Sequence, residues 1–589
     1  MKHTWISLLF ILLLSACSDT AQQSTNQQTA EASARQQPGV GAIASAHPFA
    51  TQAGIDILSE GGNAFDAAVT VAAVLAVVEP YSAGMGGGGF WLLHDAKNDK
   101  NVFVDAREKA PLAAHRDMYL DDAGNVIDGL SVNGPLAAGI PGQAAAFAHL
   151  ASQYGNLSLK QTLAPAIHYA QQGFPVDPKY QILAKYRQSI LQRYPDAASI
   201  FLNDGDVPKL GHTIQQPDLA NTLRAIAENG HDGFYKGAVA QQLIDSVQQA
   251  GGIWALEDLA QYQVVEREPI VSEYRHGKQA FKLISAPPPS SGGVALAQMF
   301  NMLESVSQDD TKGWDWTELE GADEIHLLSE IMRRAYFDRA HYLGDSDFVD
   351  VPLTKLTQQN YANKISKSIK MNKATKSASL GTQQQIYEGF HTTHFSIIDA
   401  QGNRVAATLS INLPFGSGYL AKGTGVLLNN EMDDFSVKPG EPNAYGLVGN
   451  EANAIAPEKR PLSSMSPSFM ENKDSVAIIG TPGGSRIITM VFLGLLEYVQ
   501  GKPVEKWVAR DRFHHQYLPD HIQYEKDSLS GLTLAALKLK GHDLKTIQRQ
   551  YGNMQAILWD KKNNKVSAAS DPRGIGSSLI TKPKQTETP

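Results

Sequence analysis

The sequence predicts a layered fold in which β-sheets lie inside and α-helices cover them. Two parts of the chain, unequal in length, each carry helix-like and strand-like segments. The longer part precedes residue 392 and is mostly helical in pattern between residues 140 and 262. The shorter part opens with an alternating, β-branched run and also holds the helical stretch TPGGSRIITMVFLGLLEYV. Helices and strands in both parts favour a layered arrangement of the two.

Turn and capping residues predict the first elements of the folded region. Residues 50–58 read as a helix that a pair of glycines ends. Asn63, with Asp66 three residues later, caps a second helix over Ala64–Val78, which is so rich in Ala and Val that we expect it to be buried. The run GMGGGG before the strand-like Phe90–His94 lacks the Lys of a P-loop, so we interpret these glycines as a site of close backbone packing.

The later elements follow from similar signals. Residues 286–304, APPPSSGGVALAQMFNMLE, are a turn that leads into an amphipathic helix, whereas the polar and basic residues 366–391 have almost no apolar period and indicate a loop. The β-branched run from Thr392 then predicts a strand whose even-numbered and odd-numbered side chains face opposite ways. DAQGN makes a turn, residues 405–413 return as the second strand of a hairpin, and residues 475–480 form a third strand.

Composition limits the classes of function. The 589 residues are 42% hydrophobic and 19% charged, which is typical of a globular protein with a substantial core. The net charge of −9 argues against a nucleic-acid-binding protein, because such proteins usually carry a basic surface. After residue 20 the sequence has no apolar run long enough to span a bilayer.

The N-terminus has the layout of a secretory signal. MKHTWISLLFILLLSAC, residues 1–17, has a basic start, a short apolar stretch and small residues before Cys17. LSAC resembles the lipobox of bacterial lipoproteins, and Cys17 is the only cysteine of the chain; the alternative is an ordinary signal peptide with a chance cysteine. We expect Cys17 to be the lipidated mature N-terminus, residues 18–38 to be a flexible tether, and the protein to be anchored on the periplasmic side. Ser18 favours the outer membrane.

The junction between the polar loop and the next strand suggests a chemistry. If the chain were cut just before Thr392, the strand would begin with a free threonine. Its hydroxyl is a weak nucleophile unless a base lies beside it, and its own α-amino group, with a pKa of about 7.7–8.0, is such a base. From this stretch alone, an ordinary surface loop that enters a strand is the better interpretation.

The motifs around Thr392 change that balance. Several segments closely resemble those of the gamma-glutamyltransferase family, in the same order. They are TTHFSIID, LLNNEMDDFS, RPLSSMSP and GTPGGSRI, together with DAREKAP, EGGNAFDAAV, GMGGGGF, PPPSSGG, DRFHHQ and ASDPR. The resemblance implies an α+β fold, the four-layer αββα sandwich of N-terminal nucleophile hydrolases. It also implies one precursor that cleaves itself into a large subunit, residues 39–391, and a small catalytic subunit, residues 392–589, which form a heterodimer.

The resemblance also implies roles for particular residues. Thr392 would be the nucleophile in both self-cleavage and catalysis, Ser410 would activate it, and the N–H groups of Gly483 and Gly484 would form an oxyanion hole. A γ-glutamyl group carries a carboxylate and an ammonium, and a selective pocket must satisfy both. Arg107, Ser463 and Ser464 would bind the carboxylate, Asn412, Glu431 and Asp434 the ammonium, and Tyr445 would be the gate of a lid loop over residues 438–457.

We therefore expect a gamma-glutamyltransferase and glutathione hydrolase that acts on glutathione and other γ-glutamyl compounds, with water, amino acids or dipeptides as acceptors. No cofactor is expected, and the histidine pairs His391/His394 and His514/His515 lack the pattern of a zinc site. Two alternatives stay open. One is a relative with shifted specificity, such as a cephalosporin acylase or a poly-γ-glutamate transpeptidase, and the other is a surface lipoprotein that never matures. His391, before the expected cut, differs from the commoner family residues.

Overall fold

The computed structural model describes residues 36–307, 315–381, 392–438, 443–444, 447 and 451–582. The described residues from Gln37 onward form one compact unit. The predicted signal peptide with Cys17, most of the tether, His391 and Tyr445 lie outside the described residues. The subunit boundary before Thr392 and the location at the outer membrane therefore stay predictions.

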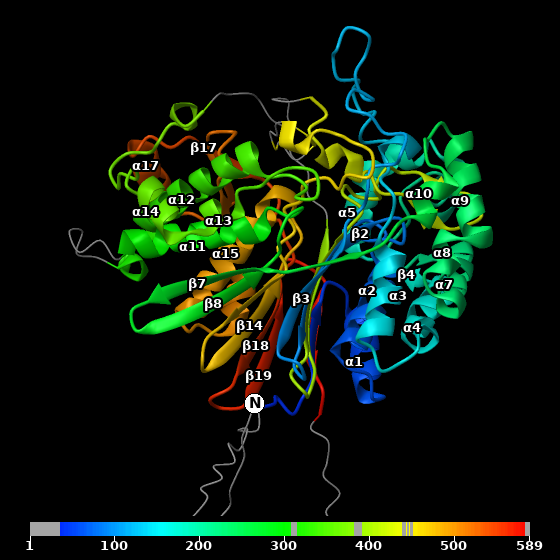
Figure 1. Ribbon diagram of the computed structural model, residues 1–589, viewed down its shortest axis with the longest axis horizontal. Coiled ribbons are helices and arrows are strands. Elements are labelled where there is room, and N and C mark those ends of the chain that lie inside the picture. Colours follow the sequence, from blue (N-terminus) through cyan, green and yellow to red (C-terminus); the bar gives the residue numbers. More distant parts are fainter. Residues whose placement is uncertain are drawn as a thin grey trace, which may run out of the picture. The chain divides into compact units, whose positions relative to one another are not determined.

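Two β-sheets lie in the middle of this unit (Figure 1). The seven-stranded sheet has the order β20-β1-β9-β10-β2-β3-β6, and the six-stranded sheet has the order β19-β18-β14-β13-β8-β7. The strands of the first sheet are β20 (Ser577–Ile580), β1 (Ala42–Ser45), β9 (Thr393–Ile398), β10 (Arg404–Ser410), β2 (Gly88–Asp95), β3 (Lys100–Ala106) and β6 (Val265–Arg267). Those of the second are β19 (Lys565–Ser570), β18 (Gln555–Asp560), β14 (Ser475–Gly480), β13 (Ser468–Glu471), β8 (Gln279–Ser285) and β7 (Ile270–His276).

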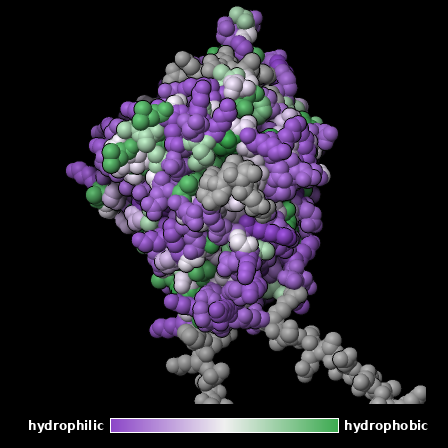
Figure 2. Space-filling view, turned by 90° about the vertical axis from the view of Figure 1, so that its left-hand side faces the viewer, coloured by the Kyte–Doolittle hydropathy of each residue, from purple (hydrophilic) through white to green (hydrophobic). Residues whose placement is uncertain are grey.

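Helices cover the outer face of each sheet. The layer at the right of Figure 1 holds α1 (Pro48–Ser59), α2 (Ala64–Val78), α3 (Gln143–Gln153), α4 (Leu159–Gln172), α5 (Pro178–Leu191), α6 (Pro195–Phe201), α7 (Pro217–Asn229), α8 (Asp232–Tyr235), α9 (Gly237–Gln249) and α10 (Leu256–Ala260). The other layer holds α11 (Gly292–Ser307), α12 (Gly321–Tyr342), α13 (Leu353–Thr357), α14 (Gln359–Ser366), α15 (Ile487–Val499), α16 (Val504–Ala509) and α17 (Gly531–Leu539). Figure 2 shows the face at the left of Figure 1, which is mostly hydrophilic with small separate hydrophobic patches.

Two large apolar cores confirm the four layers. One core joins the helices α1–α9 to one face of the seven-stranded sheet and includes Phe395 and Ile397 of β9. The other core includes Ile398 and Phe90 from the opposite face of that sheet, together with the six-stranded sheet and α11, α12 and α15. The sandwich is therefore α-β-β-α, as the sequence predicts, and strands buried on both faces hold it together.

Several local predictions are confirmed. The side chain of Asn63 accepts hydrogen bonds from the backbone at the start of α2, and that of Asp66 accepts one from the Asn63 N–H, so the capping box is complete. All 15 residues of α2 are buried. The turn Asp399–Asn403 joins β9 to β10, which pair antiparallel. No helix within the described residues is both long and apolar enough to cross a membrane.

The glycine run before β2 packs against backbone, as expected. A Cβ atom on Gly86 would lie 2.1 Å from the carbonyl oxygen of Leu427, and one on Gly87 would lie 2.1 Å from that of Ser410. Gly88 and Gly89 are confined in the same way by carbonyl oxygens of β3 and β10. A side chain at Gly87 or Gly89 would push β10 away from β2, so these two glycines fix the end of the strand that carries Ser410.

Small elements complete the structure. They are β4 (Phe174–Pro175) with β5 (Thr213–Ile214), β11 (Leu420–Ala421) with β12 (Val426–Leu427), and β15 (Phe513–His514) with β16 (Ile522–Glu525) and β17 (Leu544–Ile547). Short 3-10 helices include η4 (Glu431–Asp434) and η6 (Gly484–Arg486), and both lie beside the site described next.

Candidate active site

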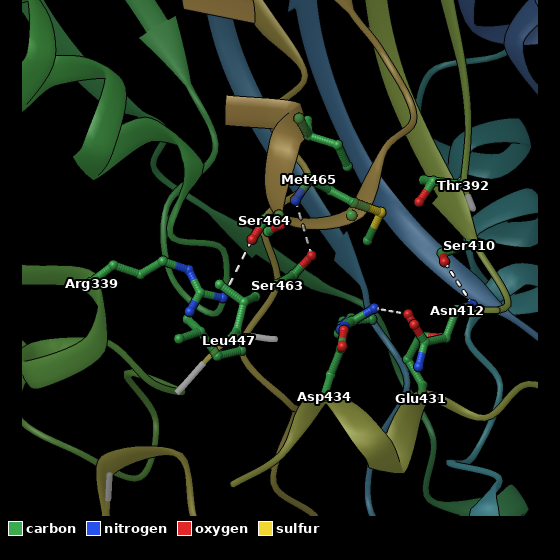
Figure 3. Close-up of a pocket in the computed structure, with 15 residues that line it drawn as sticks. Arg339, Thr392, Ser410, Asn412, Glu431, Asp434, Leu447, Ser463, Ser464 and Met465 are labelled. Atoms are coloured by element: carbon green, nitrogen blue, oxygen red, sulfur yellow. Dashed lines mark hydrogen bonds and ion pairs between the residues drawn. The ribbon is translucent and has the colours of Figure 1, made fainter. Parts of the chain in front are cut away.

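A small polar pocket lies where β9 begins and β10 ends. Nine of the residues predicted for the site line it: Arg107, Thr392, Ser410, Asn412, Glu431, Asp434, Ser463, Ser464 and Gly484. Gly483 directly precedes the last of these, and the other two predicted residues, Tyr445 and Cys17, lie outside the described residues. Segments more than 300 residues apart in the sequence thus meet in one polar pocket (Figure 3).

The start of β9 fixes the direction of Thr392. The hydroxyl of Thr393, the next residue, donates a 2.7 Å hydrogen bond to Oε2 of Glu79, which caps the C-terminus of α2 on the helical side of the sheet. Because side chains alternate along a strand, Thr392 faces the opposite side, toward the pocket. Thr392 and Ser410 enter the pocket from neighbouring strands (Figure 3).

Ser410 and Asn412 form a tight turn beyond β10. The Ser410 hydroxyl accepts a 2.8 Å hydrogen bond from the backbone N–H of Asn412, whose φ of 70° lies in the left-handed region that asparagine tolerates. The Asn412 amide donates to the carbonyl oxygen of Asn430, the residue before η4. This turn ties the end of β10 to the helix that carries Glu431 and Asp434.

A buried charge cluster forms the floor of the pocket. The guanidinium of Arg107 donates to the carboxylates of Glu431 and Asp434, and its Nη1 lies 3.6 Å from Oε2 of Glu108. Burial opposes the charge of Arg107, but Glu431 and Asp434 outweigh it and raise its pKa. Burial also raises the pKa of all three carboxyls, that of Glu108 to about 7. The attraction of Arg107 opposes this shift only in part, because three acids share the one cation. The predicted carboxylate-binding and ammonium-binding residues therefore contact one another directly.

Ser463 and Ser464 form another wall. The Ser463 hydroxyl accepts a 3.1 Å hydrogen bond from the Met465 N–H. The Ser464 hydroxyl accepts a 3.3 Å hydrogen bond from Nη2 of Arg339, which reaches the pocket from α12 (Figure 3). Both serines are buried, at 3% and 7% exposure, so their hydroxyls are held by protein contacts rather than by bulk water.

Gly483 and Gly484 lie in the turn between β14 and α15. Their φ values of 144° and 58° are in the region that only glycine adopts without strain. The turn brings Gly484 and Ser485 to the lining of the pocket that also holds Thr392. A bare backbone so near a nucleophile can present N–H groups to a developing negative charge.

Comparison with known proteins identifies the family. A family model described as "Gamma-glutamyltranspeptidase" matches residues 50–581. The chain belongs to this family. It is 43% identical over 539 residues to the "Glutathione hydrolase proenzyme" of Escherichia coli (strain K12), covering 91% of this chain and 90% of that protein. It is 44% identical over 554 residues to the protein of the same description from Pseudomonas aeruginosa, covering 92% of this chain and 95% of that one.

Solved structures agree on the fold. The cephalosporin acylase from Bacillus halodurans superposes with a TM-score of 0.79 at 26% identity, over 92% of this chain and 96% of that chain. A chain of the Helicobacter pylori gamma-glutamyltranspeptidase has a TM-score of 0.53 at 40% identity and covers 56% of this chain and 92% of its own. The sandwich is thus the architecture shared by acylases and transpeptidases of this family.

Only part of the predicted lid loop, residues 438–457, lies among the residues that the structure describes. Leu447 lines the pocket, and the amide of Asn443 donates a 3.3 Å hydrogen bond to Oδ1 of Asp434. The backbone N–H of Ala444 donates to Asp433, a buried carboxyl whose pKa burial raises to about 6. The described part of the loop is therefore tied to the same η4 helix that carries the charge cluster.

Sequence reasoning missed one charged pocket residue, Arg339. Leu328, Met332 and Ala335 form an apolar stripe on α12, and Arg339 continues that stripe at the next helical position. The helical period predicts an apolar residue at position 339, so the arginine found there could have indicated a functional side chain. Glu330, Arg333, Arg334 and Asp338 are also buried on this helix, so the sequence pattern alone does not single out Arg339.

Two of the histidines considered for zinc, His394 and His514, make ordinary hydrogen bonds. His394 contacts the hydroxyls of Thr408 and Ser396, and His514 contacts Thr489 and Gln516. Within the described ranges, one group has the spacing of metal ligands, namely His326, Glu330 and His542. The carboxylate of that Glu330 already accepts from two arginines of α12 and from the Thr375 N–H, and none of the three residues lines the pocket.

Proposed function

We propose that this protein is a self-processing gamma-glutamyltransferase and glutathione hydrolase whose nucleophile is Thr392. The observation that carries the proposal is the position of Thr392. It directly precedes β9, faces a polar pocket, and shares that pocket with two arginines, two acids and four serines. Membership of the family and the similarity to glutathione hydrolase proenzymes support the activity.

Self-cleavage would begin with attack of the Thr392 hydroxyl on the carbonyl carbon of residue 391. The resulting ester is hydrolysed, which releases residues 39–391 as the large subunit and leaves Thr392 with a free α-amino group. That amine has a reference pKa of about 7.7–8.0, so near neutral pH a useful fraction of it can accept the hydroxyl proton.

In catalysis the Thr392 hydroxyl attacks the γ-carbonyl carbon of the donor. The oxygen of that carbonyl becomes negatively charged and is stabilised by the N–H groups of Gly483 and Gly484. The C–N bond then breaks, the leaving amine takes the proton, and a γ-glutamyl ester remains on Thr392. Water or the amine of an amino acid or dipeptide attacks this ester and regenerates the enzyme. All the groups come from the polypeptide.

The charge cluster provides recognition of the donor. Arg107, Ser463 and Ser464 would bind the α-carboxylate, and Asn412, Glu431 and Asp434 would bind the α-ammonium. Because Arg107 contacts both acids directly, a zwitterionic donor that replaces these contacts exchanges one set of ion pairs for another. A donor with only one of the two charges leaves a buried ionic group without its partner, which is costly. Selectivity for an α-amino acid follows.

A cleavage assay tests the proposal. The purified protein should give two fragments on a denaturing gel, with Thr392 at the N-terminus of the smaller one. Thr392→Ala should stay uncut and inactive, while Thr392→Ser, which keeps a hydroxyl, should still be cut. An intact wild-type protein would instead support a surface protein that does not mature, and would refute the enzyme assignment.

Substrate comparison separates this activity from that of an acylase, which the likeness to the cephalosporin acylase makes the main alternative. The protein should hydrolyse γ-glutamyl-p-nitroanilide far faster than glutaryl-p-nitroanilide, which lacks the α-ammonium. A preference for the glutaryl compound would overturn the choice. Adding glycylglycine should increase release of p-nitroaniline if amines are acceptors.

For localisation we propose a lipid anchor at Cys17 on the periplasmic side, in the outer membrane, which Ser18 favours. The support is the LSAC sequence after a short apolar stretch. Wild-type protein should incorporate labelled palmitate and fractionate with outer membranes. Cys17→Ser should lose both properties, and equal labelling of the two proteins would refute the anchor.

A further inference from the structure

Arg339 is a second cation of the pocket, and its surroundings differ from those of Arg107. It is 4% exposed, at the C-terminal end of α12, and enters the pocket from the side opposite Thr392 (Figure 3). Its Nε donates a 3.0 Å hydrogen bond to the Ser291 hydroxyl, and its Nη2 donates to the Ser464 hydroxyl. Among the residues that the structure describes, no carboxylate forms an ion pair with it, whereas Arg107 has two such partners.

The hydrogen bond from Arg339 limits where the hydroxyl hydrogen of Ser464 can point. A guanidinium can only donate, so the oxygen of Ser464 accepts from it and the single hydrogen of that hydroxyl is directed elsewhere. The same holds for Ser463, whose oxygen accepts from the Met465 N–H. Both hydroxyls therefore have a hydrogen to give to an acceptor in the pocket, and the adjacent charge polarises the bond that Ser464 makes.

Ser291 extends the control to the backbone. Its hydroxyl accepts from Nε of Arg339 and donates a 2.7 Å hydrogen bond to the carbonyl oxygen of Ser463. Its N–H also donates to that carbonyl, at 2.8 Å. One planar guanidinium thus holds the Ser464 side chain directly and the Ser463 backbone through Ser291, a geometry that a single ammonium cannot copy.

The distribution of charge around Arg339 and Arg107 also favours an anionic group beside Ser464. Burial lowers the pKa of Arg339, and the longer-range attractions of Tyr336 and Asp434 oppose this only in part. Arg107 is already matched by two carboxylates and has a third, Glu108, beside it. Positive charge not neutralised by a direct partner therefore lies on the Arg339 side of Ser464, where an anionic group would be favoured.

We propose that Arg339 is a positioning residue that orients the hydroxyls of Ser463 and Ser464 toward the α-carboxylate of the donor and sets the preference for donors that carry this group. The inference rests on the proposed function. It assigns Arg339 no contact with the reacting atoms. Its effect is transmitted through the two serines and through its charge.

The test compares two donors that differ only in the α-carboxylate, γ-glutamyl-p-nitroanilide and 4-aminobutyryl-p-nitroanilide. Arg339→Gln should lower the ratio of their kcat/KM values by roughly 10- to 100-fold, as expected for lost hydrogen bonds to a charged group, with a larger effect on KM than on kcat. The ratio for Arg339→Lys should lie between those of wild type and Arg339→Gln, because lysine keeps the positive charge but lacks the planar guanidinium that donates in two fixed directions. A purely structural role would lower both activities together and leave the ratio unchanged, which would overturn the proposal.

Two controls keep the result interpretable. Arg334→Lys changes a buried arginine of the same helix whose contacts are Glu330, Ser368 and Thr375 rather than pocket residues, so its ratio should equal that of wild type. Conversion into two fragments shows that each variant has folded. If wild-type protein cleaves neither compound, the proposed function fails; if wild type is active and the ratio is unchanged in Arg339→Gln, only the role of Arg339 fails.

A double-mutant cycle tests the route of the effect. If Arg339 acts through Ser464, then Arg339→Gln combined with Ser464→Ala should lower the donor ratio by clearly less than the product of the two single effects. Independent, multiplicative effects would show that the arginine does not work through this serine, and would refute the positioning role.

Discussion

Glu108 makes the stability of the protein depend on pH in a defined window. Its carboxylate is fully buried, neither oxygen accepts a hydrogen bond from another described residue, and the nearest cation, Arg107, lies 3.6 Å away and is shared with two other acids. Burial raises the pKa of Glu108 from 4.5 to about 7, against the attraction of Arg107. The folded protein therefore holds this proton more tightly than the unfolded chain does.

The sign and size of the effect follow from linkage. With the folded pKa above the unfolded one, the contribution is fully present below pH 4.5 and is lost as pH rises to about 7. At about 1.4 kcal/mol per pKa unit, the loss amounts to about 3 kcal/mol. Glu108→Gln stays neutral throughout, so its free energy of unfolding relative to wild type should rise by about 2–3 kcal/mol between pH 5 and pH 8.

Urea unfolding at these two pH values measures the difference. Both proteins should carry Thr392→Ala, so that unfolding starts from one uncut chain. The comparison across pH removes any constant effect of placing an amide in the site. Glu458→Gln is the matched control, because Glu458 is exposed and pairs with Lys109 at the surface. Profiles of Glu108→Gln that run parallel to those of wild type would refute the reasoning.

Three further predictions concern the same region. Arg107→Lys should lower kcat/KM for γ-glutamyl-p-nitroanilide by roughly 10- to 100-fold, since one ammonium cannot donate in two fixed directions; unchanged steady-state kinetics would contradict this. Gly87→Ala should give inactive or insoluble protein, because the added Cβ would lie 2.1 Å from a carbonyl oxygen of β10, while Gly531→Ala, in open space, should behave as wild type in an activity assay. Thr393→Val should lower the free energy of unfolding by about 1–3 kcal/mol, measured with urea, and this loss should grow as pH rises. Burial raises the pKa of Glu79, whereas the Thr393 hydroxyl stabilises the charged form of Glu79, so its removal matters most at a pH where Glu79 is charged. A deficit independent of pH would count against that explanation.

Much of the fold could be predicted from local patterns in the sequence. The capping box of α2, the alternation of β9 and the close packing of the glycine run could all be predicted because each depends on residues a few positions apart. The order of strands could not, because pairing such as that of β1 with β9 and with the C-terminal β20 joins segments hundreds of residues apart. The family resemblance supplied nine pocket residues, seven of them inside the quoted motifs, yet the direct contact of Arg107 with Glu431 and Asp434 depends on three-dimensional distances that no motif encodes.

The register of one strand decides whether this pocket can act at all. A shift of β9 by a single residue would turn Thr392 toward the helices and Thr393 toward the pocket. Two features oppose that shift: Phe395 and Ile397 fill the core on the helical side, and the buried Glu79 accepts the Thr393 hydroxyl. Because Glu79 is buried and caps the fully buried α2, the direction of the proposed nucleophile is set before any cut is made. The chain end released by cleavage is therefore expected to stay where the intact chain has placed it.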